Sequence, residues 1–202
     1  MTEQTQKKYE LLKDDTVNYR GRTLYRIKAL ITFGAVVAGE LGGYIETEKN
    51  LDHSGNAWVG DDAQVYGSAR VYGSAEVCGN AEVYGNAWVG DDAQVYGNAR
   101  VYGSAQVYGN AQVYGSAEVY GNARVKSFAV ISERKMIFWA TNVGSENGTL
   151  TVFNGKDGLI VTRGCFTGTV DEFLSKSKEV HDDKTHHEYK LLIEVAQSRI
   201  LN

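Results

Sequence analysis

The sequence of 202 residues predicts a mainly β protein built around a parallel β-helix. Valine recurs every six residues from Val59 to Val125, and alanine stands two places before each of these twelve valines. The composition agrees with a repeat array, because the chain has 23 glycines, 13 tyrosines and no proline. A period so short and regular indicates stacked repeats rather than a conventional globular domain.

The repeated unit reads G-[NSD]-A-x-V-x, and its glycine is replaced by aspartate only at Asp61 and Asp91. Alanine and valine two places apart lie on the same side of an extended strand, so each unit has a narrow apolar face. The G-N or G-S pair tolerates a positive φ and allows a sharp bend before the next unit. A chain that bends every six residues must coil, with alanine and valine inside.

These units resemble the hexapeptide-repeat family, in which an aliphatic residue is followed four places later by a small one, as Val59 is by Ala63. The resemblance implies a left-handed parallel β-helix with three hexads in each triangular coil of eighteen residues. Twelve hexads then make four coils. The stretch GNAWVGDDAQVYG occurs at 55–67 and again at 85–97, five hexads apart, so we expect the two copies on different faces. Its use is architectural.

Folding the sequence at eighteen residues per coil aligns the residues that follow valine into columns. One column is a ladder of four tyrosines, Tyr66, Tyr84, Tyr102 and Tyr120. Tyrosine offers a large contact area and a polar tip, which suits a subunit interface or a surface on which a ligand stacks. The alternative is that the rings simply cover the wall. Because the hexapeptide family assembles as trimers, we expect a homotrimer that uses this ladder.

Residues 1–54 are expected to form a β-rich N-terminal cap, followed by the β-helix at 55–131. We expect a turn at Asp14–Asp15 and then a strand in TVNYRGRTLYRIKAL. If that strand is continuous, one side carries four cations, Arg20, Arg22, Arg26 and Lys28. They could bind a phosphate-bearing ligand or an acidic partner. The alternative is a solvated strand face.

Residues 132–202 are expected to form a small α+β domain with three antiparallel strands and two helices. Thr169 and Glu172 form a capping box at the start of the first helix. Because helix N-termini attract anions, Thr167 and Thr169 are candidate ligand-binding residues. The preceding Gly164–Cys165–Phe166 is either a binding loop or a tight turn with a buried cysteine. The polar stretch 181–187 matches no metal-ligand spacing.

Charge and motifs exclude several classes of protein. Acids and bases number 8 and 8 in residues 1–54, 7 and 4 in 55–126, and 10 and 9 in 127–202, so no segment favours nucleic acid as a partner. No apolar segment is long enough to cross a membrane, and Cys78 and Cys165 read as reduced thiols. His53, just before the first hexad, is the one candidate for a catalytic base. We predict no catalytic residue, metal site or cofactor.

The whole chain resembles a group of phage and prophage proteins with a lead-in like ELLKDDTVNYRGRTLYRIKAL, a solenoid of G-N-A-x-V-x units and a tail like GCFTGT. Its solenoid looks like the YdcK type. The resemblance implies a phage origin and the cytoplasm of a host bacterium. We therefore expect a non-catalytic binding protein that blocks a host defence protein or sequesters a small phosphorylated ligand. An acyltransferase-like enzyme and a purely structural assembly protein are the alternatives.

Overall fold

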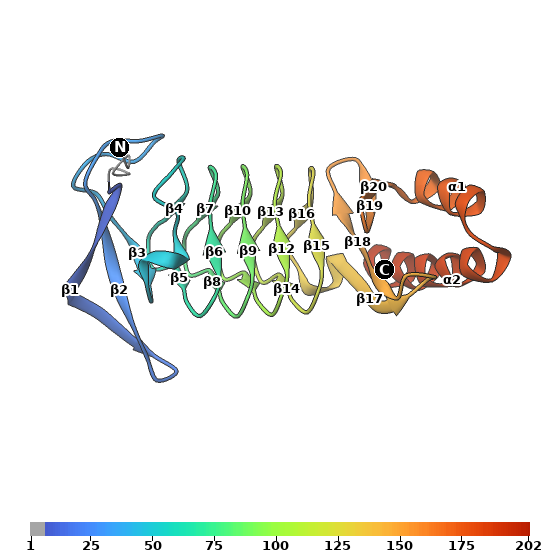
Figure 1. Cartoon of the computed structure of the whole chain (residues 1–202), viewed down its shortest axis with the longest axis horizontal. Coiled ribbons are helices and arrows are strands. Elements are labelled where there is room, and N and C mark those ends of the chain that lie inside the picture. Colours follow the sequence, from blue (N-terminus) through green and yellow to red (C-terminus); the bar gives the residue numbers. More distant parts are fainter. Residues whose placement is uncertain (1–6) are drawn as a thin grey trace, which may run out of the picture.

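The computed structural model describes residues 7–202 and shows an elongated molecule whose middle is a solenoid (Figure 1). Each hexad contributes one two-residue strand. The strands are β4 (Trp58–Val59), β5 (Gln64–Val65), β6 (Arg70–Val71), β7 (Glu76–Val77), β8 (Glu82–Val83), β9 (Trp88–Val89), β10 (Gln94–Val95), β11 (Arg100–Val101), β12 (Gln106–Val107), β13 (Gln112–Val113), β14 (Glu118–Val119), β15 (Arg124–Val125) and β16 (Val130–Ile131).

Three parallel sheets form the walls of the solenoid. We name them by their outward residues: the tyrosine wall (β5, β8, β11, β14), the glutamine wall (β4, β7, β10, β13, β16) and the arginine wall (β6, β9, β12, β15). Val65 pairs with Val83, eighteen residues later, which confirms the predicted coil. The twelve alanines and twelve valines are at most 1% exposed and fill the interior. A mainly β fold with a parallel solenoid is therefore confirmed. The left-handed coiling of the solenoid stays a prediction.

The corners of the solenoid are residues with a positive φ, as the repeat predicts. Gly85 has φ 74°, and a Cβ there would lie 3.0 Å from the backbone nitrogen of Gly103 in the next coil. The corner therefore needs glycine for its conformation and for the close stacking. Asp61 adopts φ 51° in place of glycine, and its carboxylate accepts the N–H of Gly79 at 2.9 Å. This bond offsets part of the strain of a non-glycine residue in the left-handed region.

Corresponding residues of the two copies of the thirteen-residue stretch lie on different walls, as expected. Trp58, in the first copy, belongs to the glutamine wall and packs against Phe33 with the ring centroids 5.5 Å apart. Trp88, in the second copy, belongs to the arginine wall and is 44% exposed. Identical residues thus become a core side chain in one place and a surface ring in the other.

The N-terminal segment extends the sheet of the tyrosine wall with three strands whose consecutive pairs are antiparallel: β1 (Tyr9–Tyr19), β2 (Arg22–Ala29) and β3 (Leu41–Ile45). The predicted turn at Asp14–Asp15 is wrong, since β1 runs through both residues with an irregular register after Leu12. The chain turns instead at Arg20–Gly21, where both residues have a positive φ that suits a two-residue hairpin.

Solenoid pairing begins before the first predicted hexad. β3 pairs in parallel with β5, and Leu51, just after the short helix η1 (Glu48–Asn50), bridges to Val71. Leu51 and Val59 occupy successive wall positions but are eight residues apart, two more than a hexad. The first coil therefore has room for an extra bend around His53.

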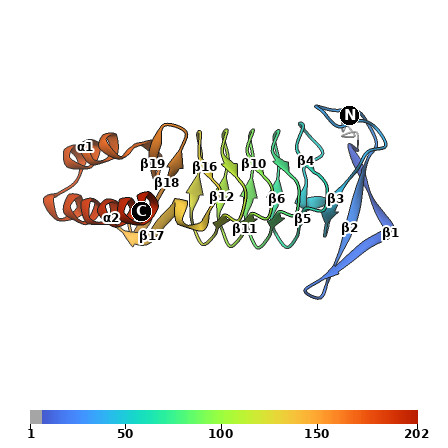
Figure 2. The same cartoon turned by 180° about the vertical axis from the view of Figure 1, so that it is seen from behind.

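The C-terminal segment folds against the last coil (Figure 2). After η2 (Arg134–Met136), it forms one antiparallel sheet of β17 (Ile137–Val143), β18 (Gly148–Gly155), β19 (Gly158–Arg163) and β20 (Phe166–Thr169), then α1 (Val170–Val180) and α2 (Asp183–Leu201). Strand β20 was not predicted. Gly164, with φ 57°, and Cys165 form a tight turn that precedes it, and Cys165 is exposed, unlike the buried cysteine of the tight-turn alternative. Neither helix among the described residues could span a membrane.

Buried polar side chains close both ends of the solenoid, where strand edges would otherwise be exposed. At the first coil, the Nζ of Lys8 donates to the carbonyl of Ala57 at 2.8 Å, and the side-chain amide of Asn50 donates to that of Ala69 at 2.9 Å. At the last coil, Thr151 Oγ1 accepts the N–H of Arg124 at 3.1 Å. The terminal segments therefore provide hydrogen-bond partners for backbone groups of the first and last coils, which a stack of repeats needs at its two ends.

Candidate functional site

The three walls differ in the charge of the residue between alanine and valine. On the tyrosine wall this column is Gln64, Glu82, Arg100 and Glu118, and on the glutamine wall it is Trp58, Glu76, Gln94 and Gln112. The arginine wall presents Arg70, Trp88, Gln106 and Arg124. Its column therefore holds two cations, an exposed indole and no acid, which makes it the wall best suited to an anionic ligand.

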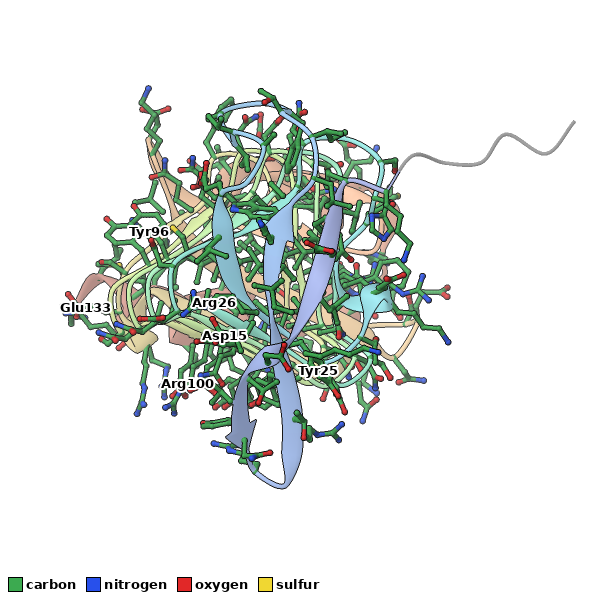
Figure 3. All side chains as sticks on the ribbon, turned by 90° about the vertical axis from the view of Figure 1, so that its left-hand side faces the viewer. Asp15, Tyr25, Arg26, Tyr96, Arg100 and Glu133 are labelled. Atoms are coloured by element: carbon green, nitrogen blue, oxygen red, sulfur yellow. The ribbon has the colours of Figure 1, made fainter. Side chains whose placement is uncertain are left out.

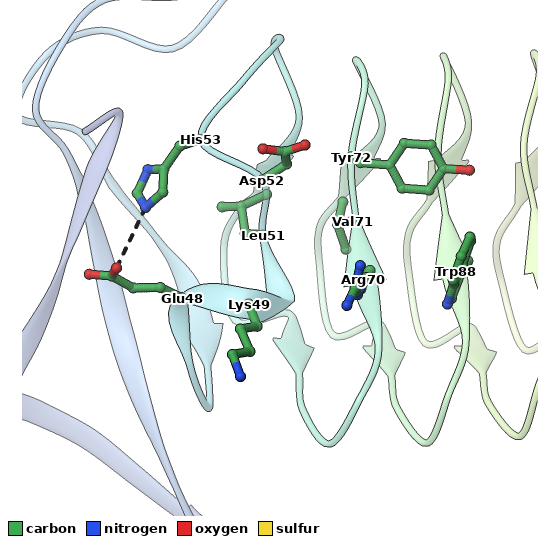
Figure 4. Close-up of a pocket in the computed structure, with 9 residues that line it drawn as sticks. All are labelled: Glu48, Lys49, Leu51, Asp52, His53, Arg70, Val71, Tyr72 and Trp88. Atoms are coloured by element: carbon green, nitrogen blue, oxygen red, sulfur yellow. Dashed lines mark ion pairs between the residues drawn. The ribbon is translucent and has the colours of Figure 1, made fainter. Parts of the chain in front are cut away.

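A pocket of about 520 Å³ opens at the first coil of the arginine wall (Figure 4). We call it the first-coil pocket; it is lined by Glu48, Lys49, Leu51, Asp52, His53, Arg70, Val71, Tyr72 and Trp88. The extra residues between Leu51 and Val59 move the chain away from the regular wall. The pocket thus exists because the first coil departs from the hexad.

Trp88 supplies the exposed ring of this pocket. Tyr72 meets it edge to face, with the ring centroids 6.3 Å apart, and the guanidinium of Arg70 lies 6.0 Å from the indole centroid. Tyr72 lies over Gly90, where a Cβ would overlap the phenol ring. Figure 4 shows Arg70, Tyr72 and Trp88 side by side along the wall. The arrangement offers a flat aromatic surface beside a cation.

The two carboxylates of the pocket are engaged within the chain. Glu48 accepts a hydrogen bond from Lys7 at 2.7 Å, and this bond is the main reason that the pKa of Glu48 is below its ordinary value. The pKa of Asp52 is also lowered, chiefly by the backbone N–H of Ser54, 3.0 Å away. Lys49 and Arg70 form no ion pair within residues 7–202 and are available to an anion.

His53 lies at the rim of the first-coil pocket but faces the N-terminal segment. Its ring stacks on Tyr9 at 4.3 Å, and its Nδ1 accepts the backbone N–H of Lys8 at 3.2 Å. Its Nε2 is buried and lies 3.8 Å from a carboxylate oxygen of Glu48. No serine or cysteine is among the residues that line the pocket, so this histidine has no nucleophile beside it there.

The strand expected to carry the four N-terminal cations is interrupted by the hairpin turn, which separates Arg20 from the three cations at alternate positions of β2. Arg20 lies in that turn, with its guanidinium over Tyr19 and Tyr84, 5.2 and 5.6 Å from their ring centroids. Arg22 pairs with Glu46, and Arg26 pairs with Asp15 and Asp62. Figure 3 shows Arg26 beside Asp15 at the N-terminal end. Lys28 is half-buried on β2. Ligand binding by these four residues stays a prediction.

The two threonines before α1 serve the helix and the sheet. Thr169 Oγ1 accepts the N–H of Glu172 at 3.3 Å, and the Glu172 carboxylate accepts the Thr169 N–H at 2.8 Å, which confirms the capping box. A carboxylate of the chain itself thus occupies the helix N-terminus where an anion was expected. Thr167 Oγ1 is buried and has no hydrogen-bond partner in the part of the chain that the structure describes.

The predicted tyrosine ladder is present as parallel stacked rings. The centroids of Tyr66, Tyr84, Tyr102 and Tyr120 are 5.0, 4.9 and 4.9 Å apart in sequence order. Tyr19 closes the ladder at one end and Trp139 at the other. Exposure rises along it, from 4% for Tyr66 under the N-terminal hairpin to 40% for Tyr120. The part of the ladder open to a partner is therefore its C-terminal half.

The polar stretch between the helices is organised by helix caps. Asp182 accepts the N–H of Thr185 at 2.8 Å, and His186 lies 3.2 Å from the hydroxyl of Ser177. No group of three or more His, Cys, Asp or Glu residues within 7–202 is arranged to hold a metal ion. Both cysteines are free thiols, and burial raises the pKa of Cys78 to about 11.

The sequence reasoning missed the first-coil pocket, although its signal was available. Folding the column between alanine and valine, rather than only the column after valine, places Arg70 and Trp88 next to each other on one wall. The eight-residue step from Leu51 to Val59 marks the departure from the hexad at the same place.

Comparison with known families agrees with the architecture. The family model described as the YdcK β-solenoid repeat matches residues 63–78, 93–106 and 105–119, all of them within the solenoid. No curated protein matches the chain. The match covers part of the solenoid, and together with the coil geometry it shows a parallel β-solenoid that contains repeats similar to the YdcK type.

Proposed function

We propose that this protein is a non-catalytic binding protein that holds a small phosphorylated ligand with a planar ring in the first-coil pocket. The observation that carries the proposal is the exposed ring of Trp88, set between Tyr72 and the unpaired guanidinium of Arg70. Any planar base can stack on an indole ring, because stacking does not depend on the hydrogen-bonding groups at the edge of the base. Arginine pairs with phosphate through two parallel hydrogen bonds. Nucleotides combine both features.

The acyltransferase alternative is not part of this proposal, because both nitrogens of His53 are directed to the N-terminal segment and to Glu48. A histidine that acts as a base must reach the proton it removes. The structural alternative explains the solenoid but gives no use to an exposed indole beside a pocket.

The test is isothermal titration calorimetry with purine and pyrimidine nucleotides, each compared with its unphosphorylated nucleoside. Trp88→Ala is expected to weaken nucleotide binding roughly 5- to 150-fold, the value of one stacked base. Tyr114→Ala, which removes a ring of the glutamine wall that does not line the first-coil pocket, is the matched control and should bind as the wild type does. Equal affinity of the wild type and Trp88→Ala, or no difference between nucleotide and nucleoside, would contradict the proposal.

We further propose that the protein acts as a homotrimer in a bacterium infected by phage, where the captured molecule belongs to host defence. Two features support this: the resemblance to phage solenoid proteins and the open half of the tyrosine ladder. Native mass spectrometry of protein recovered from infected cells would measure the number of subunits and any retained mass. A monomer without ligand would argue against this extension and leave the binding test above unaffected.

A further inference from the structure

The arginine wall has a second pocket where its last coil meets the C-terminal sheet. We call it the last-coil pocket; its volume is about 380 Å³, and it is lined by Ser104, Gln106, Asn122, Arg124, Gly148, Thr149, Arg163 and Gly164. The junction is fixed by backbone contacts, because Arg124 donates its N–H to Thr151 and its carbonyl accepts the hydroxyl of Thr162 at 2.7 Å. Strands β18 and β19 are thereby held beside β15.

The chemistry of this pocket differs from that of the first-coil pocket. Two of its eight residues are arginines, two carry hydroxyls, two carry side-chain amides, and none is acidic. Neither Arg124 nor Arg163 forms an ion pair within residues 7–202, whereas other arginines of the chain, such as Arg100 and Arg134, do. A pocket with two uncompensated guanidinium groups and several hydrogen-bond donors attracts an anion.

Arg163 is held in position before any ligand arrives. Its Nε donates to the Tyr189 hydroxyl at 3.1 Å and its Nη2 donates to the carbonyl of Val143 at 3.2 Å. The third nitrogen, Nη1, lies against Gly148, where a Cβ would approach within 2.5 Å, so only glycine leaves room for it. Nη1 makes no hydrogen bond with the residues that the structure describes and remains as a donor to the pocket. A preorganised guanidinium loses little entropy on binding.

We propose that the last-coil pocket binds a phosphoryl group between Arg163 and Arg124. The pocket offers two cationic groups, from β19 and from β15, with the hydroxyls of Ser104 and Thr149 beside them. A tetrahedral, doubly charged phosphate has enough oxygens to accept from both guanidinium groups and from hydroxyl donors. A carboxylate has one charge and two oxygens, so it would leave part of this donor set unused.

The proposal is independent of the first-coil pocket and is tested with inorganic phosphate, which lacks a ring to stack on Trp88. Binding is measured by ³¹P NMR titration at constant ionic strength. The wild type is expected to bind phosphate saturably. The exposed Arg124 side chain forms no hydrogen bond or ion pair with the described residues that a substitution would break, and Arg124→Ala should weaken binding roughly tenfold or more. Thr149→Ala should weaken it in the same direction.

Arg100→Ala is the matched control, because it removes the same charge from the solenoid at a residue of the tyrosine wall that lines neither pocket. It should leave phosphate binding unchanged. Three results would each overturn the proposal: no saturable binding by the wild type, unchanged binding in Arg124→Ala, or an equal loss in Arg100→Ala, which would show a response to net charge alone. Far-UV circular dichroism and thermal unfolding confirm that each variant is folded.

Discussion

Lys8 is a buried lysine that closes the first coil of the solenoid. It is 1% exposed, its Nζ donates to backbone carbonyls, and its ammonium lies 4.8 Å from the ring centroid of Phe33. Burial lowers its pKa from 10.5 to about 8, and Asp52 opposes this shift. Lys8 thus supplies hydrogen-bond donors to backbone carbonyls at the end of the solenoid, and the burial this requires destabilises its charged form.

The lowered pKa of Lys8 predicts that the contribution of this residue to the free energy of unfolding increases as the pH rises from 8 to 10. Because the folded protein releases the Lys8 proton at about pH 8 and the unfolded chain near 10.5, the unfolded chain holds more protons in between. The contribution of Lys8 to the free energy of unfolding should therefore rise by about 2 kcal/mol from pH 8 to pH 10. Cys78, Tyr9 and Tyr66 act in the opposite direction, because burial raises the pKa of the thiol from 9.0 to about 11 and the pKa of both phenols above the usual 10.0. Their contributions fall as the pH rises past the pKa that each group has in the unfolded chain.

Urea unfolding at intervals between pH 7 and pH 10 measures this dependence, and Lys8→Met is the control. The variant removes Lys8 and keeps the other titrating groups, so the difference in free energy of unfolding between the wild type and Lys8→Met should rise by about 2 kcal/mol from pH 8 to pH 10. A difference that stays constant over this interval would assign the effect to other groups.

At the scale of elements, two threonines of the C-terminal sheet make a matched pair. Thr151 on β18 is fully buried and accepts the N–H of Arg124 in the last coil, whereas the buried hydroxyl of Thr167 on β20 has no partner among the described residues. Replacement by valine keeps the shape of the side chain in both cases. We therefore expect Thr151→Val to lose about 1–3 kcal/mol of stability, because a buried N–H is left without an acceptor.

Thr167→Val should lose nothing, or gain stability, because it removes a polar atom that no bond satisfies. Urea denaturation of the two variants and the wild type measures the difference. Equal losses would show that the Thr151 bond does not support the docking of β18 on the solenoid.

The elements differ in how far the sequence could predict them. Each hexad repeats the same local signal, so the strands, the buried alanines and the corners could all be located. The N-terminal hairpin could not, because its turn uses a positive φ at Arg20, a residue type that rarely signals one, while Asp14–Asp15 resembles a turn and is absorbed as an irregularity of β1. Strand β20 was missed because FTGT is only four residues long, contains a glycine and lies directly between a tight turn and the cap of α1.

At the scale of the whole molecule, each coil contacts only its neighbours, so stability is a sum over coils and their interfaces. Deletion of residues 97–114, one coil of eighteen residues, should leave a folded protein, because every later strand keeps its wall. Deletion of residues 97–105, only half as many, places Val107 three residues out of phase and turns apolar side chains outward.

Thermal unfolding followed by circular dichroism should therefore give a cooperative transition for the longer deletion and a weaker one, at lower temperature, for the shorter deletion. The opposite order would mean that chain length, and not the phase of the repeat, governs stability.

The two candidate pockets depend on how segments of the whole molecule come together, so the sequence predicts some of their residues and not the pockets themselves. The first-coil pocket needs the bend around His53, and the last-coil pocket needs Arg163 of β19 brought beside Arg124 of β15. The first is a departure from the repeat and the second joins residues distant in sequence. A regular period predicts the walls well and says little about what the two ends add to them.

Because one coil takes eighteen residues, the length of the array determines the direction, around the long axis, in which the segments at its two ends face. Adding or removing a single hexad turns everything beyond it by a third of a revolution about the long axis. Arg70 and Arg124 point the same way because fifty-four residues, three full revolutions, separate them. The two copies of the thirteen-residue stretch are displaced by five hexads, which is not a whole number of revolutions. Relatives of this chain could therefore redirect one pocket relative to the other without changing a residue of either.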